Sequence, residues 1–232
     1  MGYTLDFGAV LTGEHLRWLL SGLRVTLELT ASSWILAFIV GILLVLLRNS
    51  GSKLAEIGVA AYVEVHQNVP LLVQILFWYF AMPELLPEPA RIWLNERNSE
   101  FILVMLALAF CFAAYISEAL RSGLRAIPRT QHEAGRALGF GYLSTMRHIV
   151  IPQAFRAAMP PLVNYSLLFF KNTSLAMAIG VHELTTQTRQ IENDTFRTFE
   201  AFAVATAIYL AISFLIMAAG AWLERRFTQE KR

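Results

Sequence analysis

Long runs without charged residues dominate the chain and predict membrane-spanning helices. Four such runs lie at residues 29–47, 65–83, 101–117 and 201–223. A fifth, at 157–181, is interrupted only by Lys171. Each run is close to the roughly 20 residues that a helix needs to cross the apolar core of a bilayer. The pattern therefore predicts an all-α membrane protein with five transmembrane helices.

Composition favours this prediction over the alternative of a soluble, all-α core. Hydrophobic residues make up 56% of the 232 residues, charged residues only 16%, and the mean hydropathy is +0.51. These values lie outside the usual range of soluble domains. The single cysteine, Cys111, lies within an apolar run, so neither a disulfide framework nor a cysteine metal site is expected.

The distribution of basic residues predicts the orientation of the chain. Twelve Lys and Arg residues flank the predicted spans on one side and five on the other; the twelve are Arg48, Lys53, Arg121, Arg125, Arg129, Arg136, Arg147, Arg156, Arg225, Arg226, Lys231 and Arg232. Because Lys and Arg accumulate on the cytoplasmic side, the N-terminus is expected outside and the C-terminus inside. Asp6 and Glu14 precede the first run, which is not the basic start of a cleavable signal.

The expected organisation is one transmembrane domain with short flanking segments. Residues 1–20 form an external N-terminal segment, residues 21–225 the membrane domain, and residues 226–232 a cytoplasmic tail. A loop at 121–152 lies on the cytoplasmic side of that domain.

The most distinctive polar stretch, residues 130–152, predicts two short helices with a turn between them. Thr130 and Glu133 have the spacing of a capping box. Gly139 can end the first helix in a left-handed conformation, and its lack of a side chain would also permit a close approach by a partner. A second short helix is expected over 142–149, with Pro152 restarting the chain toward the membrane. By itself this describes a capped loop joining two spans.

The same residues resemble the EAA signature of ABC importer permeases. Glu133, Ala134 and Gly135 are followed by Leu138 and Gly139, and then, after nine residues, by a stretch from Ile149 to Pro152. Gly135 stands where the signature has a second alanine, and Ile151 where leucine is usual. The resemblance implies a type I importer permease in which this loop is the coupling helix. The residues that it assigns to ATPase coupling are Glu133, Ala134, Gly135, Leu138, Gly139, Ile149 and Pro152.

Two further stretches resemble the permeases for polar amino acids, the histidine, glutamine and glutamate group. These are residues 62–74, with Asn68 and Pro70, and residues 171–185, which open with Lys-Asn-Thr-Ser. Gln67 stands where such permeases commonly carry arginine, and His66 where they carry an aromatic or aliphatic residue. The stretch from Trp78 to Glu88 most resembles glutamate/aspartate permeases. Permeases for glutamine or for a basic amino acid remain the alternatives.

Polar groups at membrane depth are candidates for the substrate pathway, because they are costly to place there. Lys171 lies in a run that also contains Pro160 and Pro161, and broken helices are where transporters often build substrate sites. Its structural alternative is an ion pair with Glu118 or Glu64. The full set of pathway candidates is Asn68, Pro70, Gln74, Glu118, Lys171, Asn172, Thr173 and Ser174.

The chain carries no Walker-type phosphate loop and no His-Glu-x-x-His zinc motif, so neither a catalytic nor a metal site is expected. The resemblance implies that ATP and Mg²⁺ are used by partner ATPase subunits, expected to be two. It also implies a second permease, identical or homologous, a periplasmic or lipoprotein solute-binding protein and a bacterial inner-membrane location. Nucleic acid is not expected as a partner. The rival hypotheses are a transporter driven by an ion gradient, an intramembrane enzyme and a membrane assembly factor.

Overall fold

The structure, a computed structural model, describes residues 4–228, and these form helices joined by short turns, with no strand among them. Parts of the predicted terminal segments, residues 1–3 and 229–232, lie outside the described residues. The helical elements in chain order are α1 (Gly8–Leu11), α2 (Gly13–Arg48), α3 (Lys53–Asn68), α4 (Leu71–Phe80), η1 (Met82–Leu85), α5 (Glu88–Asn95), α6 (Ser99–Arg125), α7 (Arg129–Ala137), α8 (Tyr142–Thr145), η2 (Met146–Val150), α9 (Ile151–Asn172), η3 (Thr173–Ile179), α10 (Leu184–Thr195) and α11 (Thr198–Thr228).

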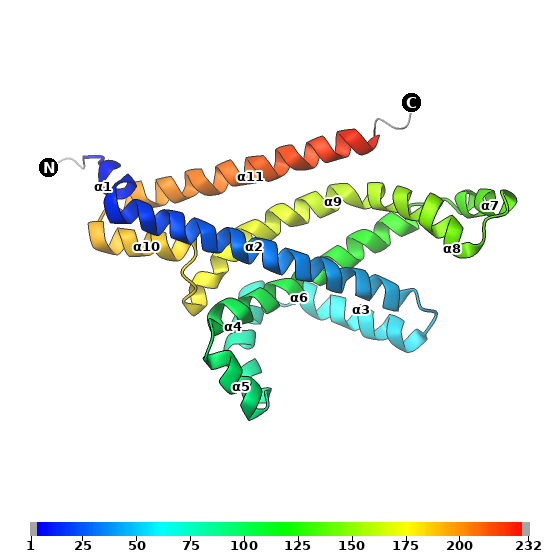
Figure 1. The fold of residues 1–232 in the computed structure, drawn as a ribbon, viewed down its shortest axis with the longest axis horizontal. Coiled ribbons are helices and arrows are strands. Elements are labelled where there is room, and N and C mark those ends of the chain that lie inside the picture. Colours follow the sequence, from blue (N-terminus) through cyan, green and yellow to red (C-terminus); the bar gives the residue numbers. More distant parts are fainter. Residues whose placement is uncertain (1–3, 229–232) are drawn as a thin grey trace.

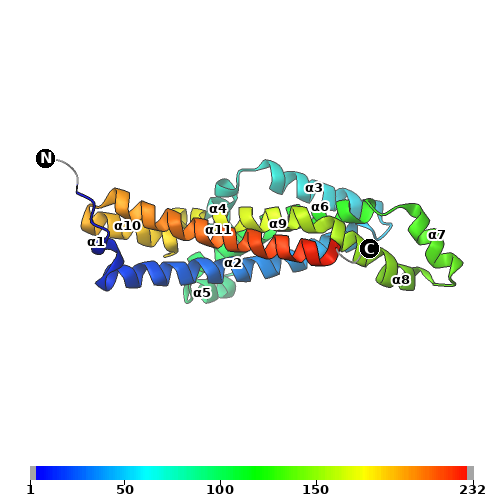
Figure 2. The same cartoon turned by 90° about the horizontal axis from the view of Figure 1, so that it is seen from above.

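Helix α6 is the centre of the bundle. It packs against α2, α9, α4 and α3, while α11 packs against α9 and α10. The long helices run beside one another, so the molecule is elongated, with α7 and α8 at one end and α1 and α10 near the other (Figures 1 and 2). The predicted coupling loop therefore lies at one end of the bundle.

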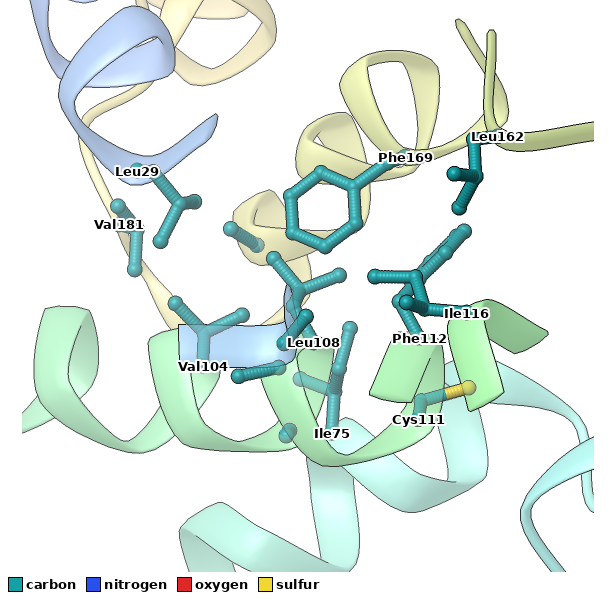
Figure 3. Packing of buried hydrophobic residues seen from close by; sticks show 14 of the residues in the cluster. Leu29, Ile75, Val104, Leu108, Cys111, Phe112, Ile116, Leu162, Phe169 and Val181 are labelled. Carbon is teal, nitrogen blue, oxygen red and sulfur yellow. The ribbon is translucent and has the colours of Figure 1, made fainter. Parts of the chain in front are cut away.

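The core is apolar and is supplied by helices that are far apart in sequence. Leu29 of α2, Ile75 of α4, Leu108 and Phe112 of α6, and Phe169 of α9 are all at most 1% exposed and belong to one cluster (Figure 3). The rings of Phe112 and Phe169 meet edge to face with their centroids 4.5 Å apart. Such packing stabilises the helix crossings by dispersion and aromatic contact.

Three of the five predicted spans are single helices, α2, α6 and α11, each long and apolar enough to cross a membrane. The second predicted span is divided between α3 and α4, because Pro70 lacks an N–H and holds Val69 in an extended conformation, with φ −88° and ψ 128°. The fourth is divided between α9 and η3. The all-helical fold is confirmed, whereas the count of five spans and the orientation stay predictions.

The predicted interruption at Pro160 and Pro161 is wrong. Both prolines lie within the continuous helix α9, and the helix changes its winding only at Thr173. Each proline removes one backbone hydrogen bond, which membrane helices tolerate when neighbouring helices support them. Here α9 is held between α6 and α11, which packs it on two sides.

The local prediction for residues 130–152 is correct in its turn and wrong in its helix limits. Helix α7 begins at Arg129, two residues earlier than a capping box at Thr130 predicts, so Thr130 lies inside the first turn and makes no capping bond. The second short helix does not stop, because α8, η2 and α9 follow without a break. Residues Met146–Val150 are wound as a π-helix directly before Pro152. Pro152 cannot donate an i→i−4 hydrogen bond, so a wider turn replaces the break that the sequence predicts.

Candidate functional site

The polar segment forms a helical hairpin in which a left-handed turn at Gly139 joins α7 to α8. Gly139 has φ +80°, as predicted. The backbone N–H of Phe140 donates to the carbonyl of Gly135 at 3.0 Å, and that of Gly139 donates to Arg136 at 2.9 Å. These two bonds make a Schellman motif, in which the left-handed residue is best suited by glycine. The turn therefore has a fixed backbone shape.

Large apolar side chains are exposed at the tip of this hairpin. Leu138 is 71% exposed, Tyr142 72% and Leu143 81%. Solvent-exposed apolar residues gathered on a short, well-ordered turn are typical of protein interaction sites. The tip is therefore a surface on which another protein can dock.

The other residues assigned to coupling lie around this tip. Glu133 and Ala134 are exposed on α7, and no described residue pairs with the Glu133 carboxylate. Ile149 is half-buried within η2, and Pro152 is exposed near the start of α9. Glu133 is thus available to a partner and does not cap its own helix.

Gly135 sets the distance between the two arms of the hairpin. It is buried, and a Cβ atom at this position would lie 2.6 Å from Cγ2 and 2.7 Å from Oγ1 of Thr145. Gln153 at the start of α9 also donates to the side-chain oxygen of Gln131 in α7, at 3.2 Å. The glycine that departs from the signature therefore lets α7 pack directly on α8.

We expect a Gly135→Ala variant to displace α7 and lower transport, although alanine is the signature's usual residue. The added methyl group meets Thr145 well inside normal contact distance, and overpacking of this kind costs about 1–3 kcal/mol. Initial uptake rates in membrane vesicles measure the effect. Adding Thr145→Ala, which removes both colliding atoms, should restore transport; a double variant as impaired as Gly135→Ala would contradict this packing.

The side chain of Gln74 in α4 bridges the break between α3 and α4. The side chain is 8% exposed, and its amide donates to the carbonyls of His66, at 3.0 Å, and Val69, at 2.8 Å. These carbonyls lie at the end of α3, where no further helical turn supplies a donor. Asn68 is exposed and donates to the backbone carbonyl of Glu64 at 2.7 Å. Gln74 thus stabilises the turn at Pro70.

The second break lies where α9 gives way to the 3₁₀ segment η3. Lys171 is exposed in the last turn of α9, followed by the half-buried Asn172. The hydroxyls of Thr173 and Ser174 donate to the carbonyls of Phe170, at 2.7 Å, and Lys171, at 2.8 Å. A lysine in this position also suits the negative end of the helix dipole.

The fold brings α4 and η3, the segments that follow the two breaks, into contact, and it pairs Glu118 with other residues. Helix α4 packs against η3, and Ile75 shares a core cluster with Ala176 and Ile179. The Glu118 carboxylate instead accepts hydrogen bonds from Arg48 at 2.6 Å and from the Nε of Arg121 at 3.0 Å. The alternative ion pair between Lys171 and Glu118 is therefore not formed.

Sequence reasoning missed a polar network around Glu183. Glu183 is fully buried; its carboxylate accepts from the backbone N–H groups of Thr185 and Thr186, at 2.9 and 2.8 Å. The hydroxyl of Tyr209 in α11 donates to it at 3.0 Å. The local signal is an acidic N-cap residue before α10, but Tyr209 is remote in sequence. The network joins α10 to α11.

Two shallow grooves lie along the first half of α11. One is lined by Leu5, Phe196, Thr198 and Phe199, and the other continues along α11 to Leu210. Their lining is almost wholly apolar, which does not suit a charged amino acid. They are not candidates for the substrate site.

Comparison with known proteins decides the family. Residues 35–229 match the family described as "Binding-protein-dependent transport system inner membrane component". The chain belongs to this family. The permease is 33% identical over 217 residues to the glutamate/aspartate import permease protein GltJ of Escherichia coli, covering 91% of this chain and 88% of that protein. It is 34% identical over 227 residues to the probable glutamine ABC transporter permease protein GlnP of Bacillus subtilis, covering 97% and 100%.

A solved structure agrees with these relatives. The permease superposes on a chain of a structure described as an amino acid ABC transporter with histidines, with a TM-score of 0.83 and 29% identity, covering 97% of this chain and 100% of that one. The protein is therefore the permease component of an amino acid ABC importer, with the type I permease fold.

Proposed function

We propose that the α7–α8 hairpin is the coupling element of this permease and docks on a partner ATPase subunit. The observation that carries the proposal is the exposure of Leu138, Tyr142 and Leu143 on a rigid turn at one end of the bundle. Docking would remove these side chains from water, which is favourable by about 25 cal/mol per Å² of apolar surface. The resemblance of residues 133–152 to the coupling signature supports the same role.

The hairpin is connected to two long helices, so a displacement of the hairpin is transmitted to them. Its first arm follows α6 after the short turn 126–128, and its second arm continues directly into α9. Because α6 is the central helix, a displacement of the hairpin acts on the packing of α2, α4 and α9. In the proposed cycle, ATP and Mg²⁺ bind two partner ATPase subunits, whose closure moves this hairpin and switches the pathway from inward- to outward-facing.

The pathway itself is proposed to lie where the α3–α4 break meets η3, at the interface with a second permease chain. Lys171 and Asn68 are exposed in this single chain and lie beside the two breaks. One chain supplies one hairpin, so two ATPase subunits require two permeases, with the same or a similar sequence. A solute-binding protein on the outer side would deliver the substrate.

We propose glutamate or aspartate as the substrate. The resemblance of residues 78–88 to glutamate/aspartate permeases and the 33% identity to GltJ support this proposal. Glutamine is the second candidate, because the identity to the glutamine permease of Bacillus subtilis is equally high, at 34%.

The experiment is reconstitution of the permease in liposomes with its candidate partner permease, ATPase and binding protein. Uptake of radiolabelled glutamate, aspartate and glutamine is followed together with ATP hydrolysis. Stimulation of both activities by glutamate or aspartate supports the proposal, and stimulation by glutamine alone moves the substrate to the second candidate. Failure to associate with any ATPase would contradict the coupling role.

A Lys171→Met variant is expected to lower glutamate uptake by about tenfold or more, because removing a charge-assisted bond to a carboxylate costs about 1.5–3 kcal/mol. Lys171→Arg keeps the charge and should retain most of the activity. If Lys171 only complements the dipole of α9, both variants should take up every substrate at the wild-type rate. Thermal stability in detergent, measured in parallel, separates loss of transport from loss of folding.

A further inference from the structure

The segment of η1 and α5 joins the end of α4 to the start of α6. Helix α4 is a short apolar helix, and the uncharged run of α6 begins at Phe101. The connection between these two membrane segments must therefore lie close to a membrane surface. Figure 1 shows α5 extending from the bundle beside α4 and away from the axis of the long helices.

One face of this segment is an exposed apolar strip of Leu85, Pro89, Ile92 and Trp93. Leu85 is 73% exposed, Ile92 50% and Trp93 51%, and Pro89 is also exposed. Within α5, the spacing of Pro89, Ile92 and Trp93 places these three residues on one side of the helix, and Leu85 precedes them at the end of η1. Leu94, which lies outside this spacing, is only 4% exposed, so α5 packs on the protein through a different side and leaves the strip exposed.

A cation is held at the edge of the strip. The guanidinium carbon of Arg97 lies 4.2 Å from the centre of a Trp93 ring, and its Nη1 donates to the carbonyl of Trp93 at 3.3 Å. A tryptophan beside an arginine is typical of the membrane interface, where the ring lies at the acyl boundary and the cation reaches lipid phosphates.

The other end of the membrane domain carries a matching pair. On α11, Trp222 is 58% exposed and the guanidinium of Arg226 lies 5.4 Å from the centre of its ring. Trp222 lies at the end of the last uncharged run and Arg226 just after it, so the pair marks the cytoplasmic interface in the predicted orientation. The Trp93–Arg97 pair precedes the run of α6 in the same way.

We propose that η1 and α5 form an interfacial anchor, with the strip in the acyl boundary of the outer leaflet and Arg97 among phospholipid phosphates. The strip continues from Phe77 and Phe80 of α4, which are 53% and 66% exposed. The anchor fixes the far end of α4, whose near end forms the break at Pro70. Phospholipid is thus the occupant of this face, in place of a partner protein.

The test uses the fluorescence of Trp93 in the full chain, with Trp18, Trp34, Trp78 and Trp222 replaced by phenylalanine. In liposomes with lipids brominated at shallow acyl positions, we expect loss of most of the Trp93 emission and little quenching by aqueous iodide. A variant that keeps only Trp222 is the matched reference. Quenching by iodide alone would show that the strip faces water and would overturn the proposal.

A second measurement distinguishes lipid from a partner protein as the occupant of the strip. The quenching measurement is repeated on the transporter assembled with its partner subunits. If the strip lies in lipid, brominated lipid should quench Trp93 as strongly there as in the single chain. Protection of Trp93 on assembly would identify a protein occupant and contradict the proposal. If the single-tryptophan variant does not fold, the unchanged chain is compared with its Trp93→Phe variant. The part of the emission that bromine quenches in the first and that is missing in the second then belongs to Trp93.

Discussion

A Leu143→Glu variant is expected to lose ATP-driven amino acid uptake by a factor of about 30. Leu143 is the most exposed apolar side chain of the hairpin tip, at 81%. If the tip docks on the ATPase, this substitution buries a carboxylate in the centre of the interface, which costs about 2 kcal/mol or more. Co-purification of the ATPase with the permease and the initial rate of uptake measure the effect.

Leu54→Glu is the matched control for this substitution. Leu54 is also a leucine on the predicted cytoplasmic side and is 84% exposed, but it lies at the start of α3, outside the hairpin. We expect it to leave ATPase binding unchanged. Equal uptake by the two variants would show that the hairpin tip has no special role in coupling.

The second large effect is expected from Gly123→Ala, which would force α6 and α9 apart. A Cβ atom at Gly123 would lie 2.3 Å from the carbonyl oxygen of Ala154 and 2.9 Å from Cβ of Ala158. Glycine allows this close approach of two membrane helices. Since the main obstacle is backbone, no side chain can rotate away, and we expect a loss of stability of about 3 kcal/mol, at the upper end for overpacking. Transport should fall as well, since both helices lead into the hairpin.

Gly58→Ala is the control for this prediction. Gly58 is exposed in α3, and no atom lies within 4 Å of the position that its Cβ would occupy. Alanine is the better helix former, so this variant should be as stable as the parent or slightly more so. Thermal unfolding in detergent compares the two. A Gly123→Ala protein as stable as Gly58→Ala would show that α6 and α9 do not cross closely there.

Features that depend on neighbours in the sequence were predictable. Uncharged runs of about 20 residues predict membrane helices because an unpaired charge is costly in hydrocarbon. The left-handed turn at Gly139 follows from the freedom of glycine at positive φ. The break at Pro70 was not predicted, because the uncharged run at residues 65–83 indicates part of a single span. The match of residues 35–229 to the permease family agrees with the resemblance found at 133–152.

Local rules failed where packing on other helices decides the outcome. Pro160 and Pro161 predict a break, yet α9 stays helical between α6 and α11. Thr130 and Glu133 have capping spacing, but the helix starts at Arg129, so Glu133 is free for a partner. A spacing records which residues can interact, and the position of the helix start decides whether they do.

The sequence by itself therefore determined that this protein is helical, where its apolar segments lie and where its α7–α8 hairpin turns. Only the tertiary structure decided that α4 packs against the η3 segment, that Glu118 pairs with Arg48, and that Leu143 is left exposed. The physical reason is that propensity and turn chemistry act over a few residues. Contacts between remote helices depend on which surfaces fit together once the helices have formed.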